Sequence, residues 1–203
     1  MSRRAHWDEI YETRAADEVS WYEAVPATSL RLISEAMKDG AESVIDIGGG
    51  ASSLVDHLLD LGLRRVAVLD ISEAGLVESK RRLGERAHDV EWIVGDVTMI
   101  ESVGSLDVWH DRAVFHFLTA EADRRHYVGI AERTLPSGGT AIIATFAPDG
   151  PERCSGLDVR RYDFGQLADQ FGASFEFIDG ERHLHDTPSG ATQSFQYSTF
   201  KRS

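Results

Sequence analysis

Short β-branched runs alternate with longer amphipathic runs from about residue 43 onward, and this alternation restricts the fold more than any other feature. The longer runs repeat apolar residues at helical spacing, as Leu54, Val55 and Leu58 do after the first strand-like run. The strand-like runs cover residues 43–47, 65–70, 90–94, 106–110 and 140–146. The pattern predicts an α/β protein with a doubly wound, mostly parallel sheet.

The pattern changes after the fifth strand-like run. Residues 147–162 form a stretch rich in Pro, Gly and Arg, which we expect to be a loop, and a short helix is predicted at 164–172. Two consecutive strand-like runs follow, at 174–185 and 192–202. They predict a C-terminal antiparallel hairpin that closes the sheet.

The N-terminal region also differs from the alternating region. Residues 26–38 predict a helix, and an irregular aromatic segment precedes it. With 203 residues, 42% of them hydrophobic, the chain is long enough for one domain with a sizeable core. We therefore divide it into an N-terminal cap and helix, 1–40, and a single globular unit, 41–203.

Charge and composition limit the classes of partner and ligand that the chain can bind. The net charge of −13 and the lack of a Lys/Arg run argue against nucleic acid, because nucleic-acid binders concentrate basic residues on one face. No apolar run approaches the roughly 18 residues that a membrane span needs, and the start, MSRRAHWDEIYE, lacks the apolar core of a signal peptide. The single cysteine, Cys154, fits a reducing compartment. We expect a cytoplasmic monomer or homodimer that acts on a small molecule, without a metal site, since His183 and His185 lack clear further ligands.

The stretch VIDIGGGASSL places an aspartate before a glycine-rich strand-to-helix turn. Gly48, Gly49 and Gly50 let a ligand approach the backbone where a Cβ would clash. Asp46 would repel a pyrophosphate, but it is well placed to attract a cationic amino acid. Asp70 closes the second strand about 20 residues beyond the glycines, where an acid typically accepts ribose hydroxyls. The turn and its acids predict a ligand that contains a ribose.

The third strand end favours an adenosyl group over a nicotinamide dinucleotide. The glycine turn and Asp70 fit either ligand, but Ser53 stands where the third glycine of the dinucleotide fingerprint would be. Asp96, directly after the third strand, accepts from an exocyclic amine, and the N–H of Val97 donates to a ring nitrogen. We expect Ile71 beside the adenine. The combination describes an adenosyl group with an amino-acid tail and a positive centre.

Four motifs, VIDIGGGAS, VLDIS, GDVT and LDVWHDRAVFHFL, resemble in their order those of class I S-adenosylmethionine-dependent methyltransferases. The terminal hairpin is similar to the last two strands of that fold, so the resemblance covers roughly residues 40 to 200. It implies a Rossmann-like methyltransferase fold, S-adenosyl-L-methionine as the cofactor and methyl transfer as the reaction.

A narrower resemblance concerns the region after the fourth strand and the N-terminal segment HWDEIYETRAADEVSWYE. Both are similar to the thiopurine methyltransferase-like branch, whose members methylate soft nucleophiles such as thiols. The resemblance implies that Trp7, Tyr11, Arg14 and Trp21 cover the methionine end of the cofactor, with Arg14 holding its carboxylate. A thiol ionises near about pH 8.5 and needs only modest activation, so a thiol acceptor suits such a site.

The fourth strand and the residues after it supply the candidates beside the acceptor. We expect His110 to contact the cofactor, and Asp111, Arg112 and His116 to be catalytic. An imidazole titrates near neutral pH, so His116 is the candidate base for an acceptor proton. The alternatives are a structural Asp111–Arg112 ion pair that orients the loop and a structural role for His116.

The acceptor itself is open between several classes. The leading interpretation is a small-molecule acceptor, such as a thiol or another soft nucleophile. The alternative is a protein lysine N-methyltransferase, because such enzymes have a similar aromatic cap and the acidic chain would attract a basic protein. An NAD-dependent oxidoreductase and a silent adenosyl-binding regulator are the remaining hypotheses.

Overall fold

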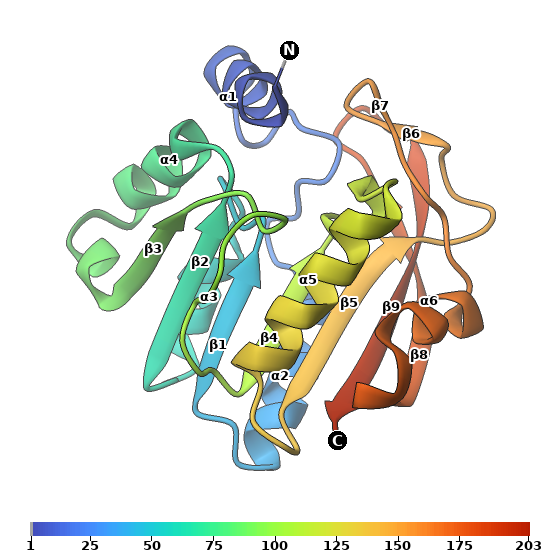
Figure 1. Ribbon diagram of the computed structural model, residues 1–203. Coiled ribbons are helices and arrows are strands. Elements are labelled where there is room, and N and C mark those ends of the chain that lie inside the picture. The colour runs from blue at the N-terminus through green and yellow to red at the C-terminus, as the bar shows by residue number, and fades with distance from the viewer. Residues whose placement is uncertain (1) are drawn as a thin grey trace.

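The computed structural model describes residues 2–203, which contain a seven-stranded sheet with the order β3-β2-β1-β4-β5-β9-β8 (Figure 1). Strands β1 to β5 run parallel, and β9 is antiparallel to both β5 and β8. Their bounds are β1 Ser43–Ile47, β2 Arg65–Asp70, β3 Val90–Val94, β4 Val108–Arg112, β5 Thr140–Phe146, β8 Phe175–Asp186 and β9 Thr192–Arg202. The predicted doubly wound sheet with a terminal hairpin is confirmed. Because the strand order reverses between β1 and β4, a crevice is expected at the carboxyl ends of these two strands.

Helices cover both faces of the sheet (Figure 1). Residues of β1 alternate between the two layers: Ile45 and Ile47 pack in the core under α5 and α6, and Val44 packs in the core under α2, α3 and α4. Asp46 therefore faces the α2–α3 layer. The helices are α2 Ala27–Lys38, α3 Leu54–Asp60, α4 Glu73–Leu83, α5 Glu121–Thr134 and α6 Phe164–Phe171, with short 3₁₀ turns η1 Gly84–Asp89, η2 Phe115–Phe117 and η3 Gly172–Ser174.

The N-terminal segment expected to be irregular begins with a helix, α1 Arg3–Thr13. The side chain of Ser2 caps it by accepting a hydrogen bond from the N–H of Ala5, at 3.2 Å. Sequence periodicity missed this helix because Ile10 is its only fully buried residue within the described chain. In Figure 1 the helix, in dark blue, lies above the carboxyl-terminal edge of the sheet.

Strand β4 lies two residues further along the chain than the sequence predicts, at 108–112 instead of 106–110. The carboxylate of Asp107 accepts hydrogen bonds from the N–H of Glu42, at 3.0 Å, and from Ser43 Oγ, at 2.7 Å, so the residues before 108 anchor the start of β1. The correction matters because the polar residues Asp111 and Arg112 lie in the strand and not in the loop after it.

The stretch 147–162, expected to be a loop, contains a small antiparallel hairpin of β6 Arg153–Cys154 and β7 Leu157–Asp158. Its two-residue turn has left-handed backbone at Ser155 and Gly156, with φ of +50° and +78°, which matches the twist that such hairpins need. The hairpin brings Cys154 and Leu157 to the carboxyl end of the sheet. Across residues 2–203, no helix combines the length and apolarity that crossing a bilayer requires.

Candidate functional site

A cavity of about 350 Å³ lies at the carboxyl ends of β1 to β4, under α1. The sheet topology predicts a ligand site at this place. Of the residues predicted from the sequence to bind cofactor or to act in catalysis, the cavity is lined by Trp7, Tyr11, Trp21, Gly48, Asp70, Ile71, Asp96, Val97 and Arg112. The first turn, three strand ends and the cap are thus brought together around one space.

The glycine turn has no room for larger residues. Gly48 has a φ of +71°, and a Cβ at this position would collide with the side chain of Val114. A Cβ on Gly49 would come within 2.6 Å of Asp46 Oδ2 and of Val68 Cγ1. The three glycines therefore let side chains of the protein, among them Val114, Asp46 and Tyr11, pack directly against the backbone of the turn.

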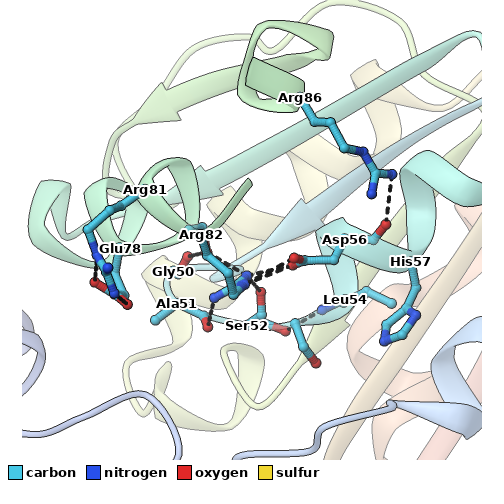
Figure 2. A network of polar contacts seen from close by, with 12 residues as sticks. Gly50, Ala51, Ser52, Leu54, Asp56, His57, Glu78, Arg81, Arg82 and Arg86 are labelled. Carbon is cyan, nitrogen blue, oxygen red and sulfur yellow. Dashed lines mark hydrogen bonds and ion pairs between the residues drawn. The ribbon is translucent and has the colours of Figure 1, made fainter. Parts of the chain in front are cut away.

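Side chains from α4 hold the back of this turn (Figure 2). Arg82 donates to the carbonyls of Ala51, at 3.0 Å, and Ser52, at 2.6 Å, and Asp56 fixes the guanidinium from the other side, at 2.6 Å. Ser79 Oγ donates to the carbonyl of Gly50, at 2.7 Å. Three successive carbonyls are thus directed toward α4. Sequence reasoning missed this support, because Arg82 stands in a run of charged residues that is typical of a solvated face.

Asp70 and Tyr11 meet at the glycine turn. A Cβ built on Gly50 would lie 2.8 Å from Tyr11 Cζ and 2.9 Å from Asp70 Oδ2. Asp70 accepts from the N–H of Ser72, at 2.7 Å, but its burial and the nearby charge of Asp46 raise its pKa to about 7. Burial and the charge of Asp70 also raise the pKa of Tyr11 well above its usual value. The end of β2 therefore offers a buried carboxyl whose ionised form would be stabilised by hydrogen-bond donors of a ligand.

The third strand end is an open turn. Asp96 Oδ1 accepts from the N–H and the hydroxyl of Thr98, at 2.9 and 2.7 Å, and its Oδ2 lies 3.7 Å from the guanidinium of Arg3. Ile71 and the buried Val97 line the cavity on either side of this turn. The arrangement makes a slot with apolar walls and a carboxylate at its edge.

The cap bridges the two sides of the cavity. Asp8 accepts from Ser72 Oγ, at 2.6 Å, on the α4 side, and Arg3 forms an ion pair with Asp123 of α5 on the other. Trp7 packs edge to face against Trp21, with ring centroids 5.7 Å apart, and against Phe117, at 5.1 Å. Aromatic rings therefore cover the space above the glycine turn. Arg3 and Phe117 were missed by sequence reasoning.

Arg14 lies apart from this cavity. It is exposed and lines a separate surface hollow together with Arg81 and Arg82. The carboxylate-holding role that the resemblance implies for it is therefore not what this geometry favours. Arg112, in contrast, lines the main cavity.

A second, smaller cavity of about 40 Å³ shares Trp21, Gly48 and Arg112 with the main one. Its wall includes Asp46 and His110. The predicted cofactor residues Asp46 and His110 thus lie at an inner extension of the site. Its volume is enough for a group of a few atoms.

Arg112 is held by the segment that follows α1. Its guanidinium donates to Glu23 Oε1 and to the carbonyl of Trp21, both at 2.7 Å. The structural alternative of an Asp111–Arg112 ion pair is not formed, because Arg112 pairs with Glu23 instead. Within residues 2–203, the buried Nε of Arg112 has no hydrogen-bond partner.

Asp111 is fully buried on the opposite side of β4. Its carboxylate accepts from Tyr127 Oη, at 2.5 Å, and from the N–H groups of Val114, at 2.8 Å, and Phe115, at 3.0 Å. Burial raises its pKa to about 6, and these donors counteract that effect. We interpret Asp111 as the residue that holds the turn after β4, in which Ala113 has a φ of +74°. Its predicted catalytic role is not favoured by this position.

His116 is also fully buried, among aromatic rings. Its Nδ1 accepts from the N–H of Phe146, at 3.3 Å, and its buried Nε2 has no partner in the described part of the chain. Burial, with the positive charge of Arg112, lowers its pKa to about 3. An imidazole with so low a pKa is a weak base, and His116 does not line the cavity. The geometry favours the structural alternative for this residue.

His183 and His185 meet at Glu23, not at the neighbouring Asp186. Their ring nitrogens lie 3.3 and 3.2 Å from Glu23 Oε1, the oxygen that also contacts Arg112. Although burial alone would raise it, hydrogen bonding to His185 and the charge of Arg112 lower the pKa of Glu23 to about 2. With the Arg112 guanidinium already on this oxygen, we interpret the group as an ionic cluster that ties the cap segment to β4 and β8.

A further part of the cavity lining is mainly apolar. It is formed by Phe117 and Leu118 after β4 and by Cys154 and Leu157 of the small hairpin. Burial raises the pKa of the Cys154 thiol, so this thiol is protonated at neutral pH. The apolar run VFHFL was a signal for this wall, but a run of that kind is equally typical of plain core.

Comparison with known proteins agrees with this geometry. Residues 45–143 match the family model described as "Methyltransferase domain". The "eEF1A lysine and N-terminal methyltransferase" of Danio rerio is 26% identical over 154 residues, which are 73% of this chain and 22% of that protein. The chain therefore spans about a fifth of the length of this relative.

Solved structures show the same fold. One, described as "Conversion of a Disulfide Bond into a Thioacetal Group during Echinomycin Biosynthesis", superimposes with a TM-score of 0.81 at 17% identity, over 99% of this chain and 93% of that one. The 1,6-didemethyltoxoflavin-N1-methyltransferase of Burkholderia thailandensis, solved with S-adenosylhomocysteine, gives a TM-score of 0.70 at 22% identity, over 90% and 80% of the two chains.

The sheet order and the solved structures show that the chain has the Rossmann-like methyltransferase fold, and residues 45–143 match a methyltransferase domain within it.

Proposed function

We propose that the protein transfers a methyl group from S-adenosylmethionine to a small-molecule acceptor, and that the acceptor is a thiol or another soft nucleophile. The observation that carries the proposal is the cavity beneath α1, which is lined both by polar strand ends and by apolar side chains. The thiopurine methyltransferase-like resemblance supports the class of acceptor. The expectations of a cytoplasmic location and of a monomer or homodimer stay predictions.

The residues present fit the cofactor. Gly48 lines the cavity with bare backbone, and a buried guanidinium N–H at Arg112 lacks a partner in the described chain. We assign the ribose hydroxyls to Asp70, the adenine to the slot of Ile71, Asp96 and Val97, and the amino-acid end to the inner extension. These assignments follow the sequence prediction, with Arg14 left out.

The cofactor supplies a methyl group that is already activated on a sulfonium, so the protein has little acid–base work to do. Trp7, Trp21 and Phe117 line the cavity with aromatic rings, which displace water from it. The rigid turn after β4, fixed by Asp111, positions the apolar wall against which the acceptor is aligned. Alignment and desolvation are therefore the main contributions of these side chains.

The size and polarity of the acceptor wall favour a small molecule over a protein. Phe117, Leu118, Cys154 and Leu157 lie under the cap, where a lysine would have to enter as an extended side chain. The lysine alternative is supported by a different observation, the likeness to the eEF1A lysine and N-terminal methyltransferase. Both acceptors use the same cofactor site.

Calorimetry with S-adenosylhomocysteine tests the cofactor site, and NADH is the comparison ligand. We expect binding of the former, and its absence at millimolar ligand would refute the proposal, as would binding of NADH in its place. A panel of thiols, selenols and basic peptides, screened for conversion of S-adenosylmethionine to S-adenosylhomocysteine, tests the acceptor. Turnover with basic peptides alone would overturn the small-molecule assignment in favour of the lysine alternative.

A further inference from the structure

Two alternate residues of β4 point to the inner extension of the cavity. His110 and Arg112 are separated by one residue in the strand, so both side chains face the same layer, and both line the extension. Strand β4 pairs with β1 in a parallel register that sets His110 directly beside Asp46. The acid of the glycine motif and the polar residues of β4 are therefore neighbours by construction of the sheet.

Asp46 is fixed by a buried chain of hydrogen bonds. His110 Nδ1 lies 2.7 Å from Asp46 Oδ1, and because a carboxylate only accepts, the nitrogen donates. His110 Nε2 lies 2.9 Å from Ser29 Oγ of α2, and Ser29 Oγ lies 3.3 Å from Tyr197 Oη of β9. Asp46, His110 and Ser29 are at most 3% exposed. The chain leaves Asp46 one orientation, with Oδ2 against the glycine turn.

Arg112 offers the complementary charge in the same small space. Glu23 and the carbonyl of Trp21 engage its terminal nitrogens, and the ring of Phe195 lies 5.0 Å from the guanidinium carbon, so the side chain is immobilised. Its buried Nε–H remains unpaired among residues 2–203, although such a donor costs free energy when left without an acceptor. A ligand carboxylate is the acceptor that suits it best.

We propose that Arg112 and His110 set the grip on the amino-acid end of the cofactor: Arg112 Nε–H donates to its carboxylate, and His110 positions Asp46 for its ammonium group. The inference rests on the proposed function, and it replaces Arg14 as the carboxylate partner. Arg112 is a binding residue in this scheme. His110 is a positioning residue that acts through Asp46.

A pair of ligands separates this role from a general effect on folding. S-Adenosylhomocysteine carries the amino-acid end, and 5′-methylthioadenosine is the same thionucleoside without it. The quantity to measure by calorimetry is the ratio of their affinities. A residue that only supports the fold changes both affinities together, whereas a residue that grips the amino-acid end changes the ratio.

We expect the unmodified protein to bind S-adenosylhomocysteine at least tenfold more tightly than methylthioadenosine. Arg112→Lys keeps the charge but not the Nε–H, and we expect it to lower the ratio about tenfold. His110→Phe should lower the ratio by a similar factor, and His110→Asn, which places an amide N–H near the position of Nδ1, should restore most of it. His110→Gln replaces His110→Phe if that variant does not fold.

Two arginine variants complete the design. Arg14→Ala removes the competing candidate, and Arg64→Ala removes an exposed arginine at the opposite end of the sheet. We expect neither to change the ratio. A lowered ratio in Arg14→Ala, an unchanged ratio in Arg112→Lys and His110→Phe, or a parallel loss of both ligands would overturn the inference. Equal affinity of the unmodified protein for the two ligands would also overturn it while leaving the proposed function intact, and failure to bind either ligand would refute the proposed function itself.

Discussion

If Asp70 binds the ribose as proposed, we expect cofactor binding to depend on pH. Its carboxyl is almost fully buried at the end of β2, close to the charges of Asp46 and Asp8, and its pKa is raised to about 7 mainly by burial. Ribose hydroxyls are donors, so they stabilise the ionised form of the carboxyl and not the protonated one. Binding of S-adenosylhomocysteine below pH 7 therefore releases a proton from Asp70.

The magnitude follows from the two states of Asp70. The rise in pKa from 3.8 to about 7 corresponds to about 4 kcal/mol, taken as an order of magnitude. In the free protein the folded state keeps this proton longer than the unfolded chain, so the free energy of unfolding falls as pH rises from about 4 to about 7. Binding has the opposite sign: the affinity rises with pH up to about 7, with a limiting slope of about tenfold per pH unit. The dissociation constant should be about tenfold higher at pH 6 than at pH 8.

Calorimetry at a series of pH values in buffers of different ionisation enthalpy checks both the slope and the released proton. Asp70→Asn has no proton to release, so its affinity should be lower at pH 8 and nearly constant between pH 6 and 8. Asp46→Asn removes a charge that raises the pKa of Asp70, so it should weaken binding and move the pH-dependent range of the affinity to lower pH without abolishing it. A flat profile in the unmodified protein, or an unchanged slope in Asp70→Asn, would refute the reasoning.

Three further predictions concern the turn and the core around it. Gly48→Ala should abolish detectable cofactor binding and lower the melting temperature more than Gly138→Ala does. Both glycines have positive φ, but of the two only Gly48 has a side chain of the described chain where the new Cβ would lie; Gly138→Ala should cost about 1 kcal/mol in chemical unfolding. Tyr127→Phe removes the hydroxyl that accepts from Trp109 Nε1 at 2.8 Å and should lower the free energy of unfolding by about 2 kcal/mol in urea titrations; a loss below about 0.5 kcal/mol would contradict that account. His116→Asn should leave the shape of the pH–rate profile for methyl transfer unchanged, because a group with a pKa of about 3 is not the base that sets it; the disappearance of a limb near neutral pH would restore His116 as the base.

The sheet could be predicted from the sequence because its strands are apolar runs of the length that buried strands have. The glycine turn and the acids Asp46, Asp70 and Asp96 could be placed for the same reason, since a parallel sheet gathers strand ends at one edge. Helix α1 could not be predicted, because it buries only one residue within the described chain. Its position depends on pairs such as Asp8–Ser72, which join distant parts of the chain. Local periodicity carries no information on such contacts.

The contacts that support the glycine turn could not be predicted from the sequence, for a related reason. Arg82 looks like a solvated residue of a charged helix, and only the packing of α4 against the turn reveals that it binds two backbone carbonyls. Arg112 and Glu23 are 89 positions apart in the chain, so their ion pair is equally invisible to spacing. Single charges gain their roles from tertiary contacts, which a sequence read alone does not supply.

The misassigned residues of β4 are a different case, because elementary strand geometry explains them. Successive side chains in a strand point to opposite faces, so Asp111 and Arg112 were poor candidates for an ion pair once both lay in the strand. The alternation sends Trp109 and Asp111 to Tyr127 of α5, and it sends His110 and Arg112 to the layer that holds the inner extension. The error came from ending the strand at residue 110, which turned a two-faced strand into a loop with free orientation. A polar strand end that alternates in this way combines two functions: one face fixes the turn beside the acceptor wall, and the other forms the extension to which we assign the amino-acid end of the cofactor.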